Sequence, residues 1–290
     1  MREPSAMPLL CVSDLDRSTR FYEDVLRFRT VGDFQGSHPG LSAATQIPDV
    51  DLHARKLINA DGVSLELVHF RNTDVEAADG PSPINRIGAS HFVFYTGSLA
   101  EALSSCESRG GTSLVDTRTE LPGGAEGIFV LDPDRVRIEL VGGAGDGGYS
   151  HPALSVQDLD RSIRFYEALG YAPTRRTEFP ASEWGDRLNG IRGLALTSQM
   201  LENAGGDRLQ LMAVSHPPVE PRDGIRPFNR LGWVNLGFDV VDLDVAAERV
   251  TALGGRMIDG TRAVIGQREQ YHGVDPDGIR VKLVAAAKSA

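Results

Sequence analysis

Two carboxylates stand inside stretches of sequence that otherwise have the apolar composition of buried strands. Glu66 lies in Leu65-Glu66-Leu67-Val68, and Glu139 lies in Ile138-Glu139-Leu140-Val141. Burying an ionised carboxylate is costly unless it is paired or bound to a metal. A shared cation would satisfy both groups. The alternative is that both carboxylates face solvent from strands whose other side is buried.

The elements that must position these groups occur in repeated order along the 290-residue chain. The segment VSDLDRSTRFYE at 12–23 returns as VQDLDRSIRFYE at 156–167, half a chain later. Each half divides again into a strand, a helix and three more strands, which gives four similar units. We expect a boundary in the Gly-rich segment 142–148, between a first domain at 1–143 and a second at 149–290.

Local signals place the first elements of each unit. The first unit opens with a strand at 8–12, and Asp14 or Asp16 is placed to cap the helix that follows. The second unit opens with a strand at 91–95 and a helix from Leu99 that ends at Gly110-Gly111. The third and fourth units begin near 151 and 233. Loops such as 33–51 and 178–192 are expected to shape any pocket.

Composition excludes several classes of function. The chain has 41% hydrophobic and 24% charged residues with a formal net charge of −10, which is typical of a globular protein. Nucleic-acid surfaces are rich in lysine and arginine, and this acidic chain has lysine only at 56, 282 and 288. No apolar run approaches the roughly 20 residues that cross a bilayer, and the start lacks a secretory signal. We therefore predict a cytoplasmic protein without nucleic-acid or membrane partners.

The repeated motifs resemble those of the vicinal oxygen chelate superfamily, which includes glyoxalases, extradiol dioxygenases and bleomycin resistance proteins. They are V-x-D-L-D-R-S-x-R-F-Y in the first and third units and D-P-D-x-x-R-[IV]-x-L in the second and fourth. The resemblance implies an α+β fold in which four βαβββ units form two tandem domains. Each domain is a curled mixed-sheet cup with its helices outside.

The resemblance also implies four metal-ligand positions in a cup, taken from the first and last strands of its units. In the first half these positions hold Met7, Glu66, His91 and Glu139. Three of them suit one divalent ion such as Fe, Mn, Co, Ni or Zn, bound in the first domain. A thioether is a poor ligand for such an ion, so Met7 either lines the pocket or lies outside it.

The second half holds a different set at the same positions. These residues are His151, Gln210, Asn235 and Lys282, and His272 lies opposite Lys282 in the last hairpin. An ammonium at Lys282 would repel a divalent cation. We therefore expect a degenerate metal site, in which these five residues either bind a ligand or belong to a purely structural duplicate.

The implied activity is chelation of two neighbouring oxygens of a small-molecule substrate, with stabilisation of an enolate or similar oxyanion. Glu139 or Glu66 would carry a proton as base, as in a glyoxalase-like or epimerase-like lyase or isomerase. Alternatives are a ring-cleaving extradiol-type dioxygenase and a metal-free binding protein that sequesters a drug. His53 is a reserve ligand, and both a monomer and a homodimer remain open.

Overall fold

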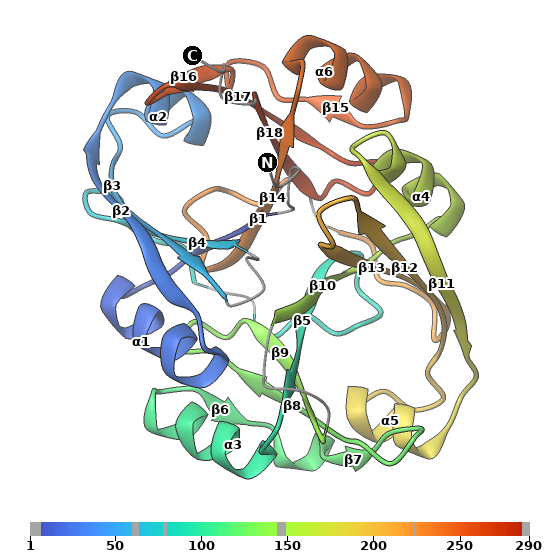
Figure 1. Cartoon of the computed structure of the whole chain (residues 1–290). Coiled ribbons are helices and arrows are strands. Elements are labelled where there is room, and N and C mark those ends of the chain that lie inside the picture. Colours follow the sequence, from blue (N-terminus) through green and yellow to red (C-terminus); the bar gives the residue numbers. More distant parts are fainter. Residues whose placement is uncertain (1–6, 60–63, 78–79, 144–148, 223, 286–290) are drawn as a thin grey trace.

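The computed structural model describes residues 7–59, 64–77, 80–143, 149–222 and 224–285. It confirms the α+β class, with two curled mixed sheets and the helices on their outer sides (Figure 1). The α-helices are α1 (Leu15–Leu26), α2 (Pro39–Thr45), α3 (Leu99–Ser108), α4 (Leu159–Glu167), α5 (Glu183–Asn189) and α6 (Leu243–Ala252), and η1 (Val115–Thr117) is a 3-10 helix. No helix in this part of the chain is long and apolar enough to cross a membrane.

Each sheet takes one unit from each half of the chain. The first has the order β15-β17-β18-β14-β1-β4-β3-β2, with β16 paired to β17. Its strands are β1 (Met7–Cys11), β2 (Arg29–Ser37), β3 (Asp51–Ile58), β4 (Ser64–Phe70), β14 (Gly232–Val240), β15 (Arg256–Met257), β16 (Ala263–Ile265), β17 (Arg268–Val274) and β18 (Arg280–Ala285). The first and fourth units therefore form one cup.

The second sheet joins the second and third units. Its order is β11-β12-β13-β10-β5-β9-β8-β6, with β7 paired to β8. Its strands are β5 (Gly88–Thr96), β6 (Thr112–Ser113), β7 (Thr119–Glu120), β8 (Glu126–Leu131), β9 (Arg137–Gly142), β10 (Tyr149–Ser155), β11 (Tyr171–Phe179), β12 (Ala195–Asn203) and β13 (Arg208–His216). The sheets are thus not divided at the boundary expected at 142–148, of which 144–148 lie outside the described residues.

The seam of each cup is an antiparallel strand pair. β1 pairs with β14, with Met7 opposite Gly237, and β10 pairs with β5, with His151 opposite Val93. Antiparallel main-chain bonding needs no crossover, so strands from distant parts of the chain can form the seam. Partners at the two seams are 55 to 67 and 221 to 230 positions apart in the sequence, so each cup combines units from both halves of the chain.

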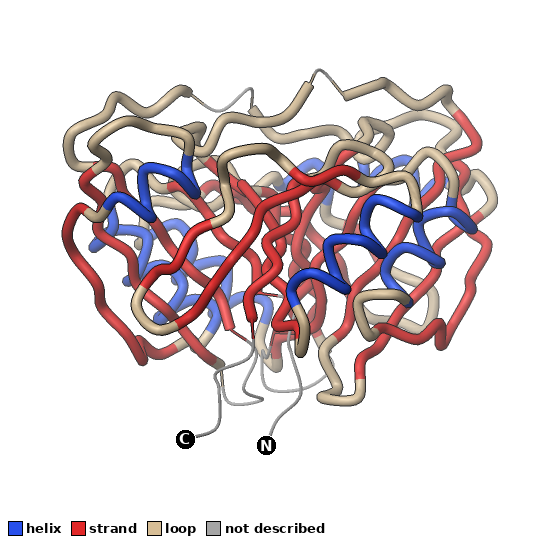
Figure 2. Tube along the Cα trace, turned by 90° about the horizontal axis from the view of Figure 1, so that it is seen from above, coloured by secondary structure: helices blue, strands red, loops and turns tan. Residues whose placement is uncertain are grey.

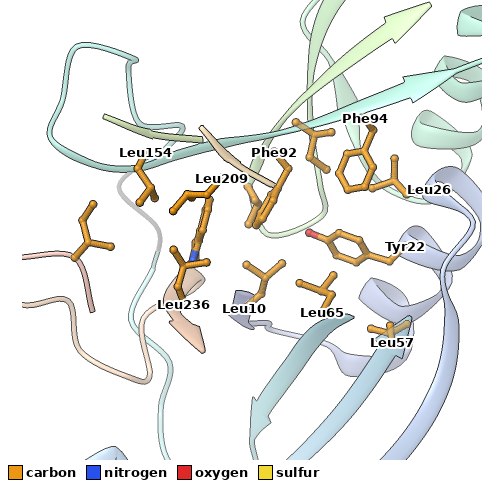
Figure 3. Close-up of a cluster of buried hydrophobic side chains, with 14 of the residues drawn as sticks. Leu10, Tyr22, Leu26, Leu57, Leu65, Phe92, Phe94, Leu154, Leu209 and Leu236 are labelled. Atoms are coloured by element: carbon orange, nitrogen blue, oxygen red, sulfur yellow. The ribbon is translucent and has the colours of Figure 1, made fainter. Parts of the chain in front are cut away.

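A single apolar core joins the two sheets. Leu10 of β1, Phe92 of β5, Leu154 of β10 and Leu236 of β14 belong to one buried cluster that also includes Tyr22 of α1 (Figure 3). Phe92 stacks on Trp233, with ring centroids 4.4 Å apart. Burial of apolar surface is the main favourable term in folding, so this core holds the two sheets together.

The two repeated motifs form a clamp between the sheets. Asp14 caps α1 by accepting a hydrogen bond from the backbone N–H of Arg17, as the sequence predicts. The Tyr22 hydroxyl of the same helix donates to Asp132 at 2.9 Å, and Ser18 donates to Asp134 at 3.0 Å. The first unit in one sheet is thereby fixed to the second unit in the other sheet.

The same clamp holds the third unit to the fourth. Tyr166 of α4 donates to Asp275 at 2.8 Å, and Ser162 donates to Asp277 at 3.1 Å. Side chains, rather than sheet hydrogen bonds, therefore link consecutive units in each half.

Replacing Tyr22 by phenylalanine is expected to lower the free energy of unfolding by about 1–3 kcal/mol, because the buried Asp132 carboxylate loses a donor. Tyr166→Phe should cost a similar amount at the equivalent clamp. The measurement is urea denaturation, with Tyr95→Phe as control, since Tyr95 is only half-buried. Equal stability of all three variants and the parent protein would show that the clamp contributes nothing.

The segments 33–51 and 178–192, expected as loops, each contain a short helix. Pro39 starts α2, where its fixed φ suits the first helical position, and the His38 side chain accepts from the Gly40 N–H at 2.9 Å. Ser182 caps α5 by accepting from Gly185. In space, α2 of the first unit contacts β16 of the fourth, and α5 of the third contacts η1 and β7 of the second.

The connectors between units, of which 71–77, 80–87, 217–222 and 224–231 are described, are joined by two isolated β-bridges, Glu76 with Arg230 and Arg86 with Glu220. Loops gather at one edge of the molecule (Figure 2). Glu76 accepts from the backbone of Leu231 and donates its N–H to Asn229, both at 2.9 Å. Glu220 makes the matching backbone bonds with Ile87 at 3.0 Å and Asn85 at 2.7 Å. The duplication therefore extends to the connectors.

Candidate metal centre

One of the two cups gathers polar side chains from four adjacent strands around a cavity of about 400 Å³. In the order β13-β10-β5-β9, these strands contribute one donor residue each to the cavity wall. The four residues are Gln210, His151, His91 and Glu139. They come from the first and last strands of the third and second units.

His91 and Glu139 face one another in this wall. The His91 Nε2 lies 3.5 Å from a Glu139 carboxylate oxygen, and the imidazole is only 2% exposed. The other ring nitrogen, Nδ1, lies 3.0 Å from the Ser90 hydroxyl, and the Phe129 ring packs edge-on at 5.1 Å. These contacts fix the ring orientation, as outer partners do for metal-ligating histidines.

His151 and Gln210 form the second pair. Burial, followed by the nearby His91, lowers the pKa of His151 to about 3, so this imidazole is neutral at ordinary pH. Gln210 donates from Nε2 to the Ser198 hydroxyl at 2.8 Å. Its hydrogen bond with His151 raises the pKa of that imidazole, but by less than burial lowers it. The amide oxygen of Gln210 is consequently the atom available to His151.

The donor set suits a divalent ion such as Fe, Co, Ni or Zn. Two imidazoles, one carboxylate and one amide oxygen are ligands that such ions accept, and neutral imidazole is the ligating form. Within the described ranges, however, no three histidine, cysteine or carboxylate side chains are already grouped as a metal site. His91 and Glu139 are in reach of one another, and His151 and Gln210 line the same cavity on the adjacent strands.

The rest of the cavity wall is largely apolar and comes from the mouth of the cup. Trp184 and Leu188 of α5 face the cavity together with Leu121 and Pro122 of the second unit. Glu139 is the one carboxylate, and Arg175 the one arginine, among the described residues that line it. A ligand would therefore meet polar donors at the sheet, an apolar wall at the mouth and a single positive charge.

The structure does not bring together the expected triad of Glu66, His91 and Glu139. Glu66 lies on β4 in the other sheet, where Lys282 Nζ contacts its carboxylate at 2.8 Å. The reason is the pairing of units, because a cup joins units from both halves and thus mixes the two sets of four positions. The half-buried carboxylate of Glu66 is paired with an ammonium.

The predicted second set is likewise divided. His151 and Gln210 belong to the cavity described above, whereas Asn235, His272 and Lys282 lie in the other sheet with Met7 and Glu66. Asn235 is fully buried, and neither its amide oxygen nor its nitrogen has a hydrogen-bond partner among the described residues. Burial lowers the pKa of His272 well below its usual range, and the positive charge of the nearby Lys282 adds to this shift.

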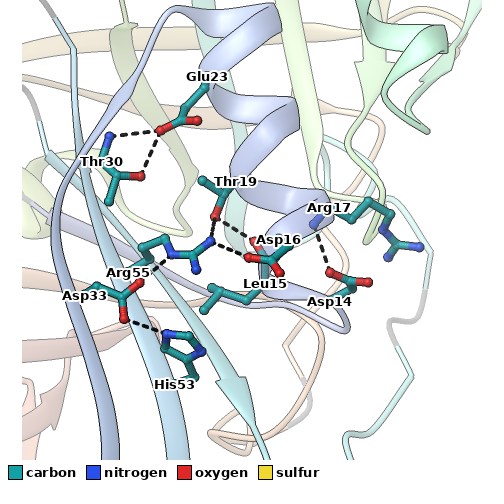
Figure 4. A network of polar contacts seen from close by, with 10 residues as sticks. All are labelled: Asp14, Leu15, Asp16, Arg17, Thr19, Glu23, Thr30, Asp33, His53 and Arg55. Atoms are coloured by element: carbon teal, nitrogen blue, oxygen red, sulfur yellow. Dashed lines mark hydrogen bonds and ion pairs between the residues drawn. The ribbon is translucent and has the colours of Figure 1, made fainter.

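The reserve ligand His53 lies in a different place again, on the outer face of the first sheet. Its Nε2 contacts Asp33 at 2.6 Å, and the same carboxylate accepts from Arg55, which also reaches Asp16 and Thr19 (Figure 4). This network joins β2, β3 and α1 and lines neither cup. His53 is therefore accounted for by an ion-pair network at the surface.

Sequence reasoning identified all four cavity residues as members of metal positions but grouped them by half. The sequence does contain a signal that the ligand positions of the second and third units belong together. Combining the second and third units gives His, Glu, His and Gln, whereas combining the first and fourth gives Met, Glu, Asn and Lys. Only the first combination collects the good ligands in one place.

Comparison with known proteins agrees with the motifs. The model of the Glyoxalase/Bleomycin resistance protein/Dioxygenase superfamily matches residues 6–140 and 148–283. Lactoylglutathione lyase of Schizosaccharomyces pombe is 28% identical over 190 residues, covering 59% of this chain and 61% of that protein. Lactoylglutathione lyase GLX1 of Arabidopsis thaliana is 29% identical over 176 residues, covering 58% of this chain and 55% of that protein. The matches thus span less than two thirds of these relatives.

Solved structures support the fold. Glyoxalase I from Zea mays superposes with a TM-score of 0.69 at 20% identity, covering 98% of this chain and 92% of that one. A putative dioxygenase from Bacillus subtilis superposes with a TM-score of 0.54 at 13% identity, and the superposition covers 100% of this chain and 87% of that one. Because the family model matches both halves of the sequence, the chain belongs to the glyoxalase/bleomycin resistance/dioxygenase superfamily and carries the family's domain twice.

Proposed function

We propose that the chain is a metal-dependent lyase or isomerase of the glyoxalase type, with one active cup built from the second and third units. The observation that carries this proposal is the presence of His91, Glu139, His151 and Gln210 on four adjacent strands around one cavity. The relatives named lactoylglutathione lyase support the same class of reaction.

The four donor residues would hold one divalent metal ion. When bound, such an ion supplies a Lewis acid for two neighbouring oxygens of a substrate. His91 is held in place by Ser90 and Phe129, and His151 is kept neutral by burial. His151 is therefore ready to act as a ligand without losing a proton.

Glu139 is the group that moves a proton. It is the one carboxylate among the described residues of the cavity wall, and its side chain is 15% exposed. A carboxylate within reach of a carbon next to a carbonyl can take its proton and return it to the neighbouring carbon. The amide of Gln210 cannot do so, because it does not titrate.

The remaining wall selects the substrate class. A small molecule with two neighbouring oxygens would place these at the four donors and its apolar part against Trp184 and Leu188. Arg175 would receive an anionic group of the same molecule. Excluding water at the mouth strengthens the electrostatic interactions inside.

The test uses protein loaded with Ni(II) or Zn(II) and the formation of lactoylglutathione from methylglyoxal and glutathione. Glu139→Gln is expected to lower kcat by roughly 100-fold or more, because proton transfer is lost. Glu66→Gln is the matched control and should stay within about twofold, since Glu66 lies in the other cup. Loss of activity in Glu66→Gln with full activity in Glu139→Gln would contradict the assignment of the active cup.

A second candidate, an extradiol-type dioxygenase, has one observation in its favour. His91, His151 and Glu139 make up two imidazoles and one carboxylate, the donor set of non-haem Fe(II) oxygenases. The chain loaded with Fe(II) would then consume oxygen in the presence of a catechol. Oxygen uptake without lactoylglutathione formation would favour this function over the lyase.

A further inference from the structure

A second cavity of about 460 Å³ lies beneath the two connectors, which are hydrogen-bonded to one another, and between the two cups. The connectors 71–87 and 217–231 contribute to it, together with the starts of β5, β9 and β14. Among the described residues that line it are six arginines and a single carboxylate, that of Asp134. The arginines are Arg86, Arg135, Arg137, Arg222, Arg226 and Arg230.

The carboxylates near these arginines are largely occupied. Asp134 accepts from Ser18 at 3.0 Å and from Arg17 at 3.2 Å, in the clamp on α1. Glu220 pairs with Arg86 at 2.8 Å, where both side chains are more than 40% exposed. Among the described residues, Glu139, Glu76 and Asp275 act on the charges of Arg137, Arg226 and Arg222 respectively, but each less strongly than burial does.

Arg137 lines the cavity, and its equivalent in the fourth unit, Arg280, lies next to the wall, where its Nη2 donates to the Arg226 carbonyl at 3.2 Å. Arg137 lies over the Phe129 ring at 4.4 Å, and Arg280, just behind the wall, lies over the Phe228 ring at 5.3 Å. They are only 9% and 3% exposed. The Nε of each, and the Nη1 of Arg280, have no hydrogen-bond partner among the described residues.

Two further arginines reach in from the connector 217–231. A Cβ on Gly88 would come within 2.7 Å of Arg222 Nη1, and a Cβ on Gly232 within 3.2 Å of Arg226 Nη2. Both glycines have positive φ and start β5 and β14. Any larger residue would displace the guanidinium groups, so the backbone is shaped to admit them.

These guanidinium groups repel one another. Burial lowers the pKa of Arg226 and of Arg280 to about 10 in each case, and the nearby Arg222 adds to both shifts. Glu76 and Asp275 act in the opposite direction, on Arg226 and Arg222 respectively, but do not cancel the effect. Buried, like-charged groups with unused donors are stabilised by a bound anion.

We propose that this cavity binds a small anion that carries a diphosphate group. Arg137, Arg222 and Arg226 line the cavity and carry planar donor forks, which match phosphate oxygens in pairs. A diphosphate group brings about three negative charges in a compact volume, whereas a single carboxylate brings one. The cavity is large enough for an organic group attached to the diphosphate.

The experiment is titration calorimetry of the full-length protein with inorganic pyrophosphate, inorganic phosphate and citrate. Arg222→Gln/Arg226→Gln is expected to weaken pyrophosphate binding by roughly tenfold or more. The matched control is Arg249→Gln, which removes an exposed arginine of α6 and should bind as the parent does. His91→Ala should also bind as the parent does, which separates this site from chelation of a metal in the other cavity.

Thermal unfolding without ligand gives an independent readout. The double variant should melt at the same temperature as the parent or higher, because repulsion between the guanidinium groups is relieved. Pyrophosphate should raise the melting temperature of the parent and of Arg249→Gln but not of the double variant. Equal pyrophosphate binding by the parent and the double variant, or binding of citrate alone, would overturn the proposal.

Discussion

His151→Ala is expected to remove the bound metal from the protein, although His151 lies in the half of the chain that holds Lys282. The parent protein should contain about one divalent transition metal per chain. Loss of one neutral imidazole from the donor set should weaken metal affinity by at least roughly 100-fold. Mutation of a residue that only hydrogen-bonds to a metal ligand already lowers metal affinity by about 10- to 100-fold. The measurement is elemental mass spectrometry of the purified protein, followed by titration with Zn(II).

Matched variants at equivalent positions make this result specific. His91→Ala should lose the metal to the same extent, whereas Met7→Ala and Asn235→Ala, which alter the equivalent positions in the other sheet, should retain it. Retention of metal in His151→Ala together with its loss in Glu66→Gln would instead favour a metal site formed by Glu66, His91 and Glu139 of the first half of the chain. Absence of metal from all variants and the parent after reconstitution would favour a binding protein without metal chemistry.

Much of the fold follows from local sequence signals. Asp14 and Asp158 start helices as caps, and the buried face of α1 carries Leu15, Tyr22, Val25 and Leu26 at helical spacing. The repeat gives four units in the same order. The two short helices α2 and α5 were harder to predict, because seven residues give too little periodicity to distinguish a helix from a loop.

The grouping of units could not be predicted in the same way. It depends on which strands meet at the seams, β1 with β14 and β5 with β10, and this pairing joins residues at least 55 positions apart. Local propensity and periodicity contain no information on such contacts. The candidate ligands lie on the strands expected for them, but the structure places Glu66 in the other sheet from His91 and Glu139.

The first and fourth units carry other residues than the second and third at the equivalent positions of their cup. In that sheet Lys282 of β18 sits opposite Gly237 of β14, which in turn sits opposite Met7 of β1. A Cβ on Gly237 would lie 3.1 Å from Lys282 Cε, so the missing side chain leaves room for the lysine to reach Glu66. The equivalent of Gly237 in the other cup is Val93, beside Glu139. An ammonium thus occupies the cup that lacks good ligands.

Lys282→Met is expected to lower the free energy of unfolding by about 2–3 kcal/mol. The change keeps the length and much of the volume of the side chain but leaves the Glu66 carboxylate without its cation. Breaking a buried ion pair costs about 3–5 kcal/mol, and the 24% exposure of the Glu66 side chain lowers this figure through contact with water. Urea denaturation at neutral pH measures the loss.

A double-mutant cycle separates the ion pair from simple packing. Glu66→Leu/Lys282→Met should recover most of the stability, because replacing both partners by apolar groups of similar volume is often neutral or stabilising. Metal content should be unchanged in both variants, since the donors lie in the other sheet. If the double variant is as unstable as the sum of its single variants, the two side chains act independently. Lys282 would then stabilise this cup by packing alone.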